Sequence, residues 1–183
     1  MPLTVQEQLM IEVWSAQHNI AVDNDVVEKI EAFCDLIRSW SKRMNLISQG
    51  DLGHIIERHF LDSLMPIEII TQVGQLLDVG SGAGFPAIPL VLLRPAANFT
   101  LVESTHKKAL FLRAVIERLD LHYVEIMETR IENLKPIPEY NIITVRALPH
   151  WEKLKDKIMA FLNSKGKIIY YEKRGVFRQI EKR

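Results

Sequence analysis

The sequence has 183 residues, of which 48% are hydrophobic and 25% charged, and its basic and acidic side chains are equal in number. This length can bury one sizeable core, so we expect one domain with an appendage. The longest apolar stretches, such as 88–93, fall far short of the roughly 18 residues that a membrane span needs. Composition therefore predicts a soluble protein without a membrane partner or a targeting segment. We further expect a cytoplasmic monomer.

Cys34 is the only cysteine, so no internal disulfide can form. Its apolar neighbours at helical spacing predict a buried core residue. A single cysteine without a disulfide is typical of a reducing compartment. Charge is divided along the chain, because residues 1–75 carry a net charge of −6 and residues 76–183 carry +6. The second part is therefore the better candidate for contact with a polyanion, although the same charges can also solvate helix surfaces.

The N-terminal residues 1–72 are predicted to form a helical cap. Apolar side chains at helical spacing indicate three helices, over about 4–17, 24–40 and 55–64. Thr4-Val5-Gln6-Glu7 has the form of a capping box, which predicts the start of the first helix. Pro66 is expected to end or bend the third.

Residues 73–183 change to an alternation of strands and helices. Apolar runs of strand length lie at 76–79, 99–103, 124–127, 142–145 and 167–171, and helical patterns lie at 86–93, 107–119 and 148–162. This alternation predicts a Rossmann-like α/β fold, with a mainly parallel sheet and helices on both faces. Residues 172–183 are short and polar, so we expect five parallel strands, truncated C-terminal strands and an exposed sheet edge.

A glycine-rich loop, Gly80-Ser81-Gly82-Ala83-Gly84, follows the first predicted strand and precedes a predicted helix. Glycines allow positive φ and a close approach of the backbone to a ligand. Phe85 stands where a dinucleotide fingerprint requires its third glycine. The tighter spacing favours a ligand without pyrophosphate, such as S-adenosylmethionine, over a nicotinamide dinucleotide.

Two acids lie beside this loop in the predicted sheet. Glu103 ends the second strand, where a carboxylate can accept hydrogen bonds from both ribose hydroxyls of a nucleoside. Asp78 precedes Gly80 by two residues and could orient the loop. The alternatives are that Asp78 only caps the loop and that Glu103 is an exposed acid at a strand end.

Four segments together resemble the RsmG family, also called glucose-inhibited division protein B (GidB). They are 42–46 (KRMNL), 57–64 (ERHFLDSL), 77–89 (LDVGSGAGFPAIP) and 100–113, which contains TLVES and FLR. Weaker matches follow at 130–132 and 144–147. The resemblance spans about residues 40–166, and the combination is more specific than any single segment.

The resemblance implies a class I S-adenosylmethionine-dependent methyltransferase fold. It also implies methyl transfer to N7 of a guanine in the decoding-region loop of bacterial 16S rRNA, with the rRNA or the small ribosomal subunit as partner. By motif position, the family's cofactor contacts fall on Gly80, Phe85, Ile131, Glu132 and Arg146. To these we add Gly82 of the loop and Glu103 as the ribose acid. The expected cofactor site is therefore Gly80, Gly82, Phe85, Glu103, Ile131, Glu132 and Arg146.

Guanine N7 has an in-plane lone pair and no proton to lose, so this reaction requires alignment rather than a general base. We accordingly expect no metal site and no catalytic triad. Arg146 is the candidate for positioning the base or the cofactor; alternatively it pairs with an acid such as Glu132. Candidate RNA contacts are Arg58, Lys107, Lys108 and Arg113. For His59, a packed or helix-orienting role is at least as compatible with the sequence as an RNA contact, and the same alternative applies to Arg58.

Two other functions stay open at this point. One is methyl transfer to another substrate, and the other is an RNA-binding module that binds the cofactor but has lost activity. A nicotinamide oxidoreductase is disfavoured by the loop spacing. The basic segment 164–183 either touches RNA or is simply solvated.

Overall fold

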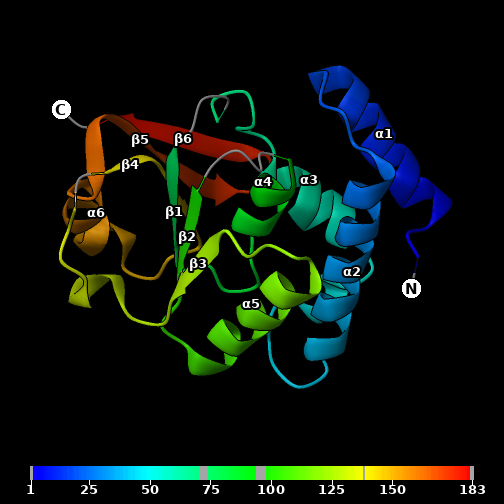
Figure 1. Ribbon diagram of the computed structural model, residues 1–183, viewed down its shortest axis with the longest axis horizontal. Coiled ribbons are helices and arrows are strands. Elements are labelled where there is room, and N and C mark those ends of the chain that lie inside the picture. The colour runs from blue at the N-terminus through cyan, green and yellow to red at the C-terminus, as the bar shows by residue number, and fades with distance from the viewer. Residues whose placement is uncertain (1, 71–73, 94–97, 138, 182–183) are drawn as a thin grey trace.

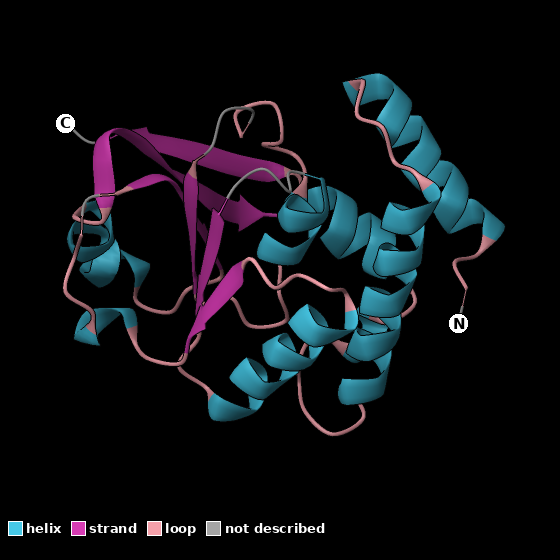
Figure 2. Ribbon diagram, in the orientation of Figure 1, coloured by secondary structure: helices cyan, strands magenta, loops and turns pink. Residues whose placement is uncertain are grey.

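The computed structural model describes residues 2–70, 74–93, 98–137 and 139–181. Helices gather beside a six-stranded sheet whose strand order is β3-β2-β1-β4-β5-β6 (Figures 1 and 2). The strands are β1 (Gln75–Val79), β2 (Asn98–Val102), β3 (Val124–Met127), β4 (Tyr140–Arg146), β5 (Leu162–Lys173) and β6 (Val176–Glu181). All neighbouring pairs are parallel except β5 and β6. The predicted Rossmann-like fold is confirmed.

The first two helices, α1 (Val5–His18) and α2 (Asn24–Trp40), begin at side-chain caps, as their sequences predict. Thr4 and Glu7 form a reciprocal capping box, because each side chain accepts a hydrogen bond from the other residue's backbone N–H. Cys34 is completely buried on α2. Burial raises the pKa of its thiol to about 12, so this cysteine is a core residue.

The third predicted helix is interrupted. After a short 3-10 turn, η1 (Gln49–Asp51), the chain forms a π-helical turn, η2 (Ile56–Phe60), and then a short helix, α3 (Leu61–Ser63). The apolar side chains of this segment still face the core, since Ile56, Phe60 and Leu64 are buried. Asp62 and Ser63, which follow the π turn, are buried in the interior, where polar side chains need partners.

Helices cover both faces of the sheet, as the alternation of side chains along the strands requires. The helices after β1 are α4 (Ala87–Leu93), α5 (His106–Arg118), η3 (Ile131–Asn133) and α6 (Trp151–Met159). Leu76 and Ile142 join a hydrophobic cluster with α2, α4 and α5, whereas Leu77 and Ile143 join a second cluster with α6. Adjacent residues of one strand therefore serve opposite layers.

The five predicted parallel strands are present, but the expectation that the sheet ends with the fifth, at an exposed edge, is wrong. β5 is longer than predicted, and the chain turns at Gly175 (φ +76°) into β6, which pairs with it in antiparallel fashion. Although the segment is polar, its few apolar side chains are placed to pack, because Phe177 contacts one core cluster and Ile180 the other. The polar residues between them face outward, and Arg178 pairs with Glu172.

No helix in the described part of the chain combines the length and the apolar character needed to cross a membrane. The predicted boundary between the cap and the core, at residues 72 and 73, lies outside the described residues. One cluster of buried side chains nevertheless includes residues from both sides of it, such as Phe33 of α2 and Leu112 of α5.

Candidate cofactor cleft

The glycine loop after β1 is held against the end of β2. The N–H groups of Gly80 and Ser81 both donate to the carbonyl oxygen of Val102, at 2.8 and 3.1 Å. Gly80 and Gly84 have φ of +78° and +84°, which side chains with a Cβ rarely adopt. A Cβ at Gly84 would also lie 2.7 Å from Cγ1 of Ile88. The loop therefore requires glycine both for its turn and for its contact with α4.

Asp78 lies beneath this loop and is only 1% exposed. Its Oδ1 accepts a hydrogen bond from Thr144 Oγ1 at 2.6 Å, and its carbonyl oxygen accepts one from Ser81 Oγ at 3.2 Å. Oδ2 has no hydrogen-bond partner among the described residues. Burial raises the pKa of this carboxyl to about 6. Asp78 thus connects β1 both to β4 and to the loop.

Glu103 holds the loop from the other side. It is 4% exposed, and its two carboxylate oxygens accept hydrogen bonds from Gly82 N–H at 2.8 Å and Thr105 N–H at 2.6 Å. The alternative of an exposed acid at a strand end is therefore wrong. Its expected contact with a ribose stays a prediction, because the structure shows this carboxylate bonded to the backbone of the loop.

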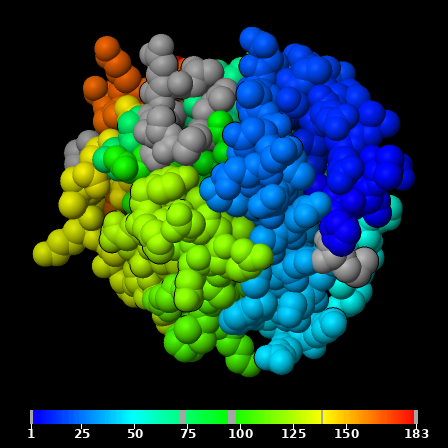
Figure 3. All heavy atoms as spheres, turned by 45° about the vertical axis from the view of Figure 1, so that its right-hand side comes forward, coloured from blue at the N-terminus to red at the C-terminus, as the bar shows by residue number. Residues whose placement is uncertain are grey.

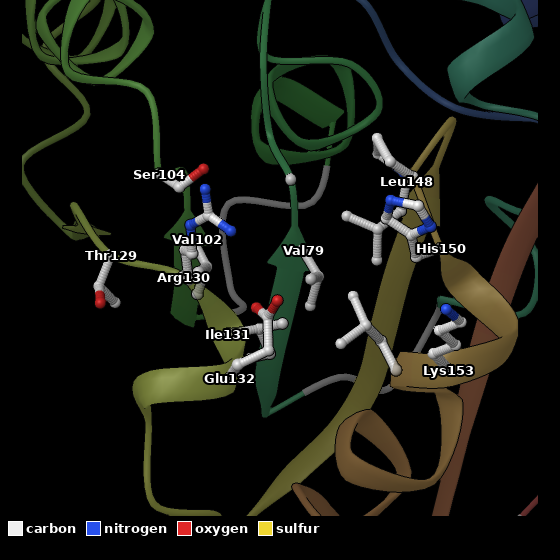
Figure 4. Close-up of a pocket in the computed structure, with 13 residues that line it drawn as sticks. Val79, Val102, Ser104, Thr129, Arg130, Ile131, Glu132, Leu148, His150 and Lys153 are labelled. Atoms are coloured by element: carbon white, nitrogen blue, oxygen red, sulfur yellow. The ribbon is translucent and has the colours of Figure 1, made fainter.

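A cleft of about 510 Å³ opens at the carboxyl ends of β1 and β2 (Figure 4). Its lining residues are Val79, Gly80, Val102, Ser104, Thr129, Arg130, Ile131, Glu132, Leu148, Pro149, His150, Lys153 and Leu154. Figure 4 shows Arg130 and Glu132 on one side of Val79, and His150 and Lys153 on the other. Ligands of doubly wound sheets bind at such strand ends, where the strand order reverses.

The structure brings three of the seven expected cofactor residues into this cleft: Gly80, Ile131 and Glu132. Glu132 is exposed, and its carboxylate has no partner among the described side chains. Gly82, Phe85, Glu103 and Arg146 lie outside the lining, and the roles assigned to them stay predictions. Phe85 is buried between Phe33 and the ring of His59, with centroid distances of 5.3 and 5.1 Å.

Arg146, the last residue of β4, enters a buried junction instead. Its Nη2 lies 2.7 Å from Oδ2 of Asp62, and its Nη1 donates to Ser63 Oγ at 3.2 Å. The guanidinium also lies 5.7 Å from the centre of the Tyr171 ring. The alternative that Arg146 pairs with an acid is correct in kind, but the acid is Asp62 of the cap and not Glu132.

The same junction includes the hairpin of β5 and β6. Tyr171 donates its hydroxyl proton to the carbonyl oxygen of Ser63 at 2.6 Å, and Gly175 N–H donates to Asp62 Oδ1 at 2.6 Å. Burial raises the pKa of the Tyr171 phenol well above its ordinary value, so the phenol stays protonated. Both carboxylate oxygens of Asp62 are therefore bonded, one to Arg146 and one to the hairpin.

Arg58 and His59 have structural partners in this fold. Arg58 Nη1 lies 2.9 Å from Oδ1 of Asp51, and His59 Nε2 lies 3.5 Å from its Oδ2. Hydrogen bonds from Ser48 and Arg58 lower the pKa of Asp51 to about 2. Burial, and secondly the charge of Arg146, lower the pKa of His59, which favours a neutral ring at physiological pH. These contacts support the helix-orienting interpretation of His59.

The other predicted RNA contacts lie on α5 and differ from one another. Arg113 is paired with Glu128 at 2.7 Å, and His106 contacts the same carboxylate at 2.6 Å. Lys107 is exposed and Lys108 is half-buried, and neither has an acidic partner among the described residues. Of the predicted set, Lys107 and Lys108 are thus the cations available to an external phosphate.

Sequence reasoning missed the wall of the cleft formed after β4. Leu148, His150 and Lys153 come from the turn and helix that follow Arg146. Ala147 and His150 have φ of +51° and +58°, unusual values for residues with side chains. The position just after a parallel strand was the available signal, but side-chain type gave no further indication.

Comparison with known proteins extends these observations. Residues 26–183 match the GidB family, described as rRNA small subunit methyltransferase G. The ribosomal RNA small subunit methyltransferase G of Chloroflexus aggregans is 37% identical over 168 residues, which cover 89% of this chain and 70% of that protein. The protein of that name from Streptococcus pneumoniae strain R6 is 30% identical, over 84% of this chain and 68% of its own. The chain spans 66% of the Roseiflexus relative and 61% of the Halorhodospira halophila relative.

Solved structures with less than 20% identity share the fold. M. jannaschii TYW2 in complex with AdoMet superposes with a TM-score of 0.55 at 17% identity, over 70% of this chain and 55% of that one. Coclaurine N-methyltransferase, bound to N-methylheliamine and SAH, has a TM-score of 0.55 at 17% identity, over 90% and 58% of the two chains. With the family match covering most of its length, this chain belongs to the GidB family of rRNA small subunit methyltransferases.

Proposed function

We propose that this protein transfers a methyl group from S-adenosylmethionine to N7 of a guanine in the decoding-region loop of 16S rRNA. The observation that carries the proposal is the position of the cleft, beside the glycine loop and at the carboxyl ends of β1 and β2, in a chain of the GidB family. The names of the relatives support an rRNA substrate. The guanine N7 position, a cytoplasmic location and a monomeric state are finer predictions.

The cleft fits the proposed cofactor in size and in chemistry. Its volume of about 510 Å³ lies within the roughly 300–1,000 Å³ of small-molecule sites. Val79, Val102 and Ile131 supply an apolar surface for a purine, and the unpaired carboxylate of Glu132 can accept hydrogen bonds from hydroxyl or amino groups. The wall of the cleft needs glycine at position 80, because its φ is +78° and a Cβ there would lie 3.0 Å from Cδ1 of Leu148.

The reaction asks the protein mainly for alignment. When bound, S-adenosylmethionine supplies an electrophilic methyl group on its sulfonium. Guanine N7 presents an in-plane lone pair and has no proton to remove, so no side chain has to act as a base. Holding the two reactants in line can contribute several kcal/mol through proximity and orientation. The rigid loop supports that role, since Asp78 and Glu103 hold it from both sides.

Arg146 is proposed to position the target base or the cofactor at the end of β4. Its side chain is 19% exposed, so part of it is accessible while Asp62 and Ser63 hold the remainder. Arg146→Ala should reduce methyl transfer, and because it leaves the buried Asp62 carboxylate without its cation it should also lower the free energy of unfolding, so transfer is measured well below the unfolding midpoint. Arg146→Lys keeps the charge but loses the fork of donors, so it should recover little activity. Wild-type transfer by either variant would refute the assignment.

The decisive experiment is transfer of radiolabelled methyl to under-methylated small subunits and to naked 16S rRNA, with mapping of the modified base. We expect label at N7 of one guanine. Label on protein or small molecules alone would point to another substrate. Binding of S-adenosylmethionine by calorimetry, without transfer to either RNA, would instead indicate a cofactor-binding module that has lost activity. Calorimetry with NAD serves as the negative control.

A further inference from the structure

A second cavity, separate from the cofactor cleft, lies between the end of α2 and the start of α5. It has a volume of about 340 Å³ and is lined by Ser39, Trp40, Arg43, Met44, Lys107 and Leu110. Figure 3 shows the green surface of α5 beside the light-blue surface at the end of α2. We call this cavity the α2–α5 groove.

Local structure explains why these side chains converge. The amides of Arg43 and Met44 both donate to the carbonyl oxygen of Trp40, at 2.9 and 3.1 Å, so one further helical turn follows the end of α2 and places both side chains beside Trp40. The ring of Trp40 is held against Phe111 of α5, at a centroid distance of 5.6 Å and an angle of 68°. The groove therefore lies at the edge of the hydrophobic core, and packing holds its aromatic side chain in place.

The charges of the α2–α5 groove are all positive. None of its lining residues is acidic, and neither Arg43 nor Lys107 has an acidic partner within the described residues. Other basic side chains of α5 do have an acidic partner, because His106 and Arg113 share the carboxylate of Glu128. Leu110 adds an apolar side chain that is 41% exposed. Unpaired cations beside an aromatic and an aliphatic surface match the chemistry of a nucleotide, whose phosphate is anionic and whose base is flat and apolar on its faces.

The groove also lies close to the cleft along the chain. Ser104 lines the cleft and Lys107 lines the groove, and three residues span at most about 11 Å. A strand of RNA with one nucleotide in the cleft could therefore reach the groove with a neighbouring one. The segment 42–46, which matches the family pattern but contributes nothing to the cleft, supplies Arg43 and Met44.

We propose that the α2–α5 groove binds an unpaired nucleotide of the substrate RNA, its phosphate between Arg43 and Lys107 and its base against Trp40 and Leu110. This inference rests on the proposed function and extends it, because it names a second contact for the same substrate. It predicts that the RNA is bound as an unstacked single strand at this point.

The first test measures the affinity of the full chain for a short single-stranded RNA as the salt concentration is varied. Each lost phosphate contact should lower the slope of log affinity against log salt by about 0.7. The double variant Arg43→Ala/Lys107→Ala removes both cations from the one proposed phosphate and should therefore lose about 0.7 in slope. The matched control Arg118→Ala/Lys135→Ala removes the same charge from exposed positions outside the groove and outside the basic segment 164–183, and it should keep the wild-type slope.

A second variant tests the apolar part. Leu110→Glu leaves the buried core intact and places a negative charge in the groove, so RNA affinity should fall about tenfold or more, comparable to the loss of one stacked base. The control Ile137→Glu makes the same change at another exposed apolar residue, which is 60% exposed. Equal effects of the groove variants and their controls would overturn the proposal. A changed sedimentation coefficient with an unchanged RNA slope would also overturn it, by identifying an interface between copies of this chain.

The two proposals can fail separately. If the wild-type chain methylates no RNA but the groove variants still weaken RNA binding, the methyltransferase assignment fails and the groove stands. If methyl transfer occurs and the groove variants bind RNA like wild type, the groove fails and the activity stands.

Discussion

The cofactor cleft and the junction around Arg146 both lie at carboxyl ends of strands, yet their charges are handled in opposite ways. In the cleft, Arg130, Glu132 and Lys153 are exposed and have no ion-pair partners among the described residues. In the junction, Asp62 is buried and both of its carboxylate oxygens are bonded. Buried charge must be partnered within the protein, whereas exposed charge in a cleft is available to a ligand. The cleft therefore has the character of a binding surface, and the junction has that of the structure that supports it.

The junction also explains why distant segments act together. Asp62 comes from the helical cap, Arg146 from β4, and Gly175 from the turn that leads into β6. These three are far apart in sequence but are joined by one carboxylate. The cap and the terminal hairpin are therefore both connected to the end of β4, next to the segment that forms one wall of the cleft.

The largest effect should follow from breaking the junction. Asp62→Ala leaves the Arg146 guanidinium half-buried without its carboxylate and the Gly175 amide without its acceptor, so we expect a loss of about 3–5 kcal/mol in the free energy of unfolding. Denaturant titration measures it. Glu68→Ala, at an exposed acid of the same region, is the control and should be neutral. A loss of less than 1 kcal/mol, the usual range of an exposed pair, would contradict the buried character of the junction.

A smaller effect depends on pH and concerns Asp78. Because burial raises its folded pKa to about 6, above the ordinary 3.8, the folded state binds this proton more tightly than the unfolded state. Stability should therefore fall as pH rises through this window, by up to about 3 kcal/mol. Asp78→Asn removes the titration, so the stability of wild type relative to this variant should decline from about pH 4 to about pH 6. A difference that does not change with pH would exclude the raised pKa.

In the cleft, the corresponding change should affect binding and not stability. Glu132→Gln removes the charge of an exposed, unpaired carboxylate, so we expect about a tenfold loss in affinity for S-adenosylmethionine with an unchanged unfolding midpoint. Calorimetry and thermal unfolding measure the two quantities. Glu125→Gln, on an exposed position of β3 outside the cleft, is the matched control. If Glu132→Gln bound the cofactor as tightly as wild type, this side of the cleft would not be its site.

The smallest effect should come from a charge pair that lies at neither place. Arg113 and Glu128 are joined at 2.7 Å, but the arginine side chain is 46% exposed. Arg113→Ala should leave the unfolding midpoint unchanged. Water solvates and screens both charges of an exposed pair, so the pair contributes little net stability. A marked destabilisation would show that the exposure of an ion pair does not predict its contribution to stability, and the contrast with the buried Asp62–Arg146 junction would fail.

Much of the fold followed from local patterns in the sequence. The cap of α1 at Thr4, the start of α2 after Asp23 and the boundaries of β3 agree with the structure to within a residue or two. These features depend on neighbouring residues, either through backbone N–H groups that need a capping acceptor or through the spacing of apolar side chains. The glycine loop was predicted for the same reason, since its backbone requirements lie within five consecutive residues.

The last strand was missed because its stability does not come from its own composition. Half of residues 176–181 are polar, and pairing with β5 together with contacts through Phe177 and Ile180 makes a strand of them. The partner of Arg146 was missed for a related reason. Glu132 was the acid expected at a neighbouring strand end, whereas the π turn in η2 brings Asp62 to the guanidinium across 84 residues of sequence.

Local sequence patterns predict the glycine loop, the first five strands with the helices between them, and the family to which the chain belongs. These rest on spacing within short segments, which backbone geometry constrains directly. The folded structure was needed to establish which charged side chains are paired within the protein and which are available to a ligand. Whether Arg146, Glu103 or Lys107 has a partner depends on residues brought together by long-range packing, and burial then determines whether each charge must be paired inside the protein or can bind a ligand.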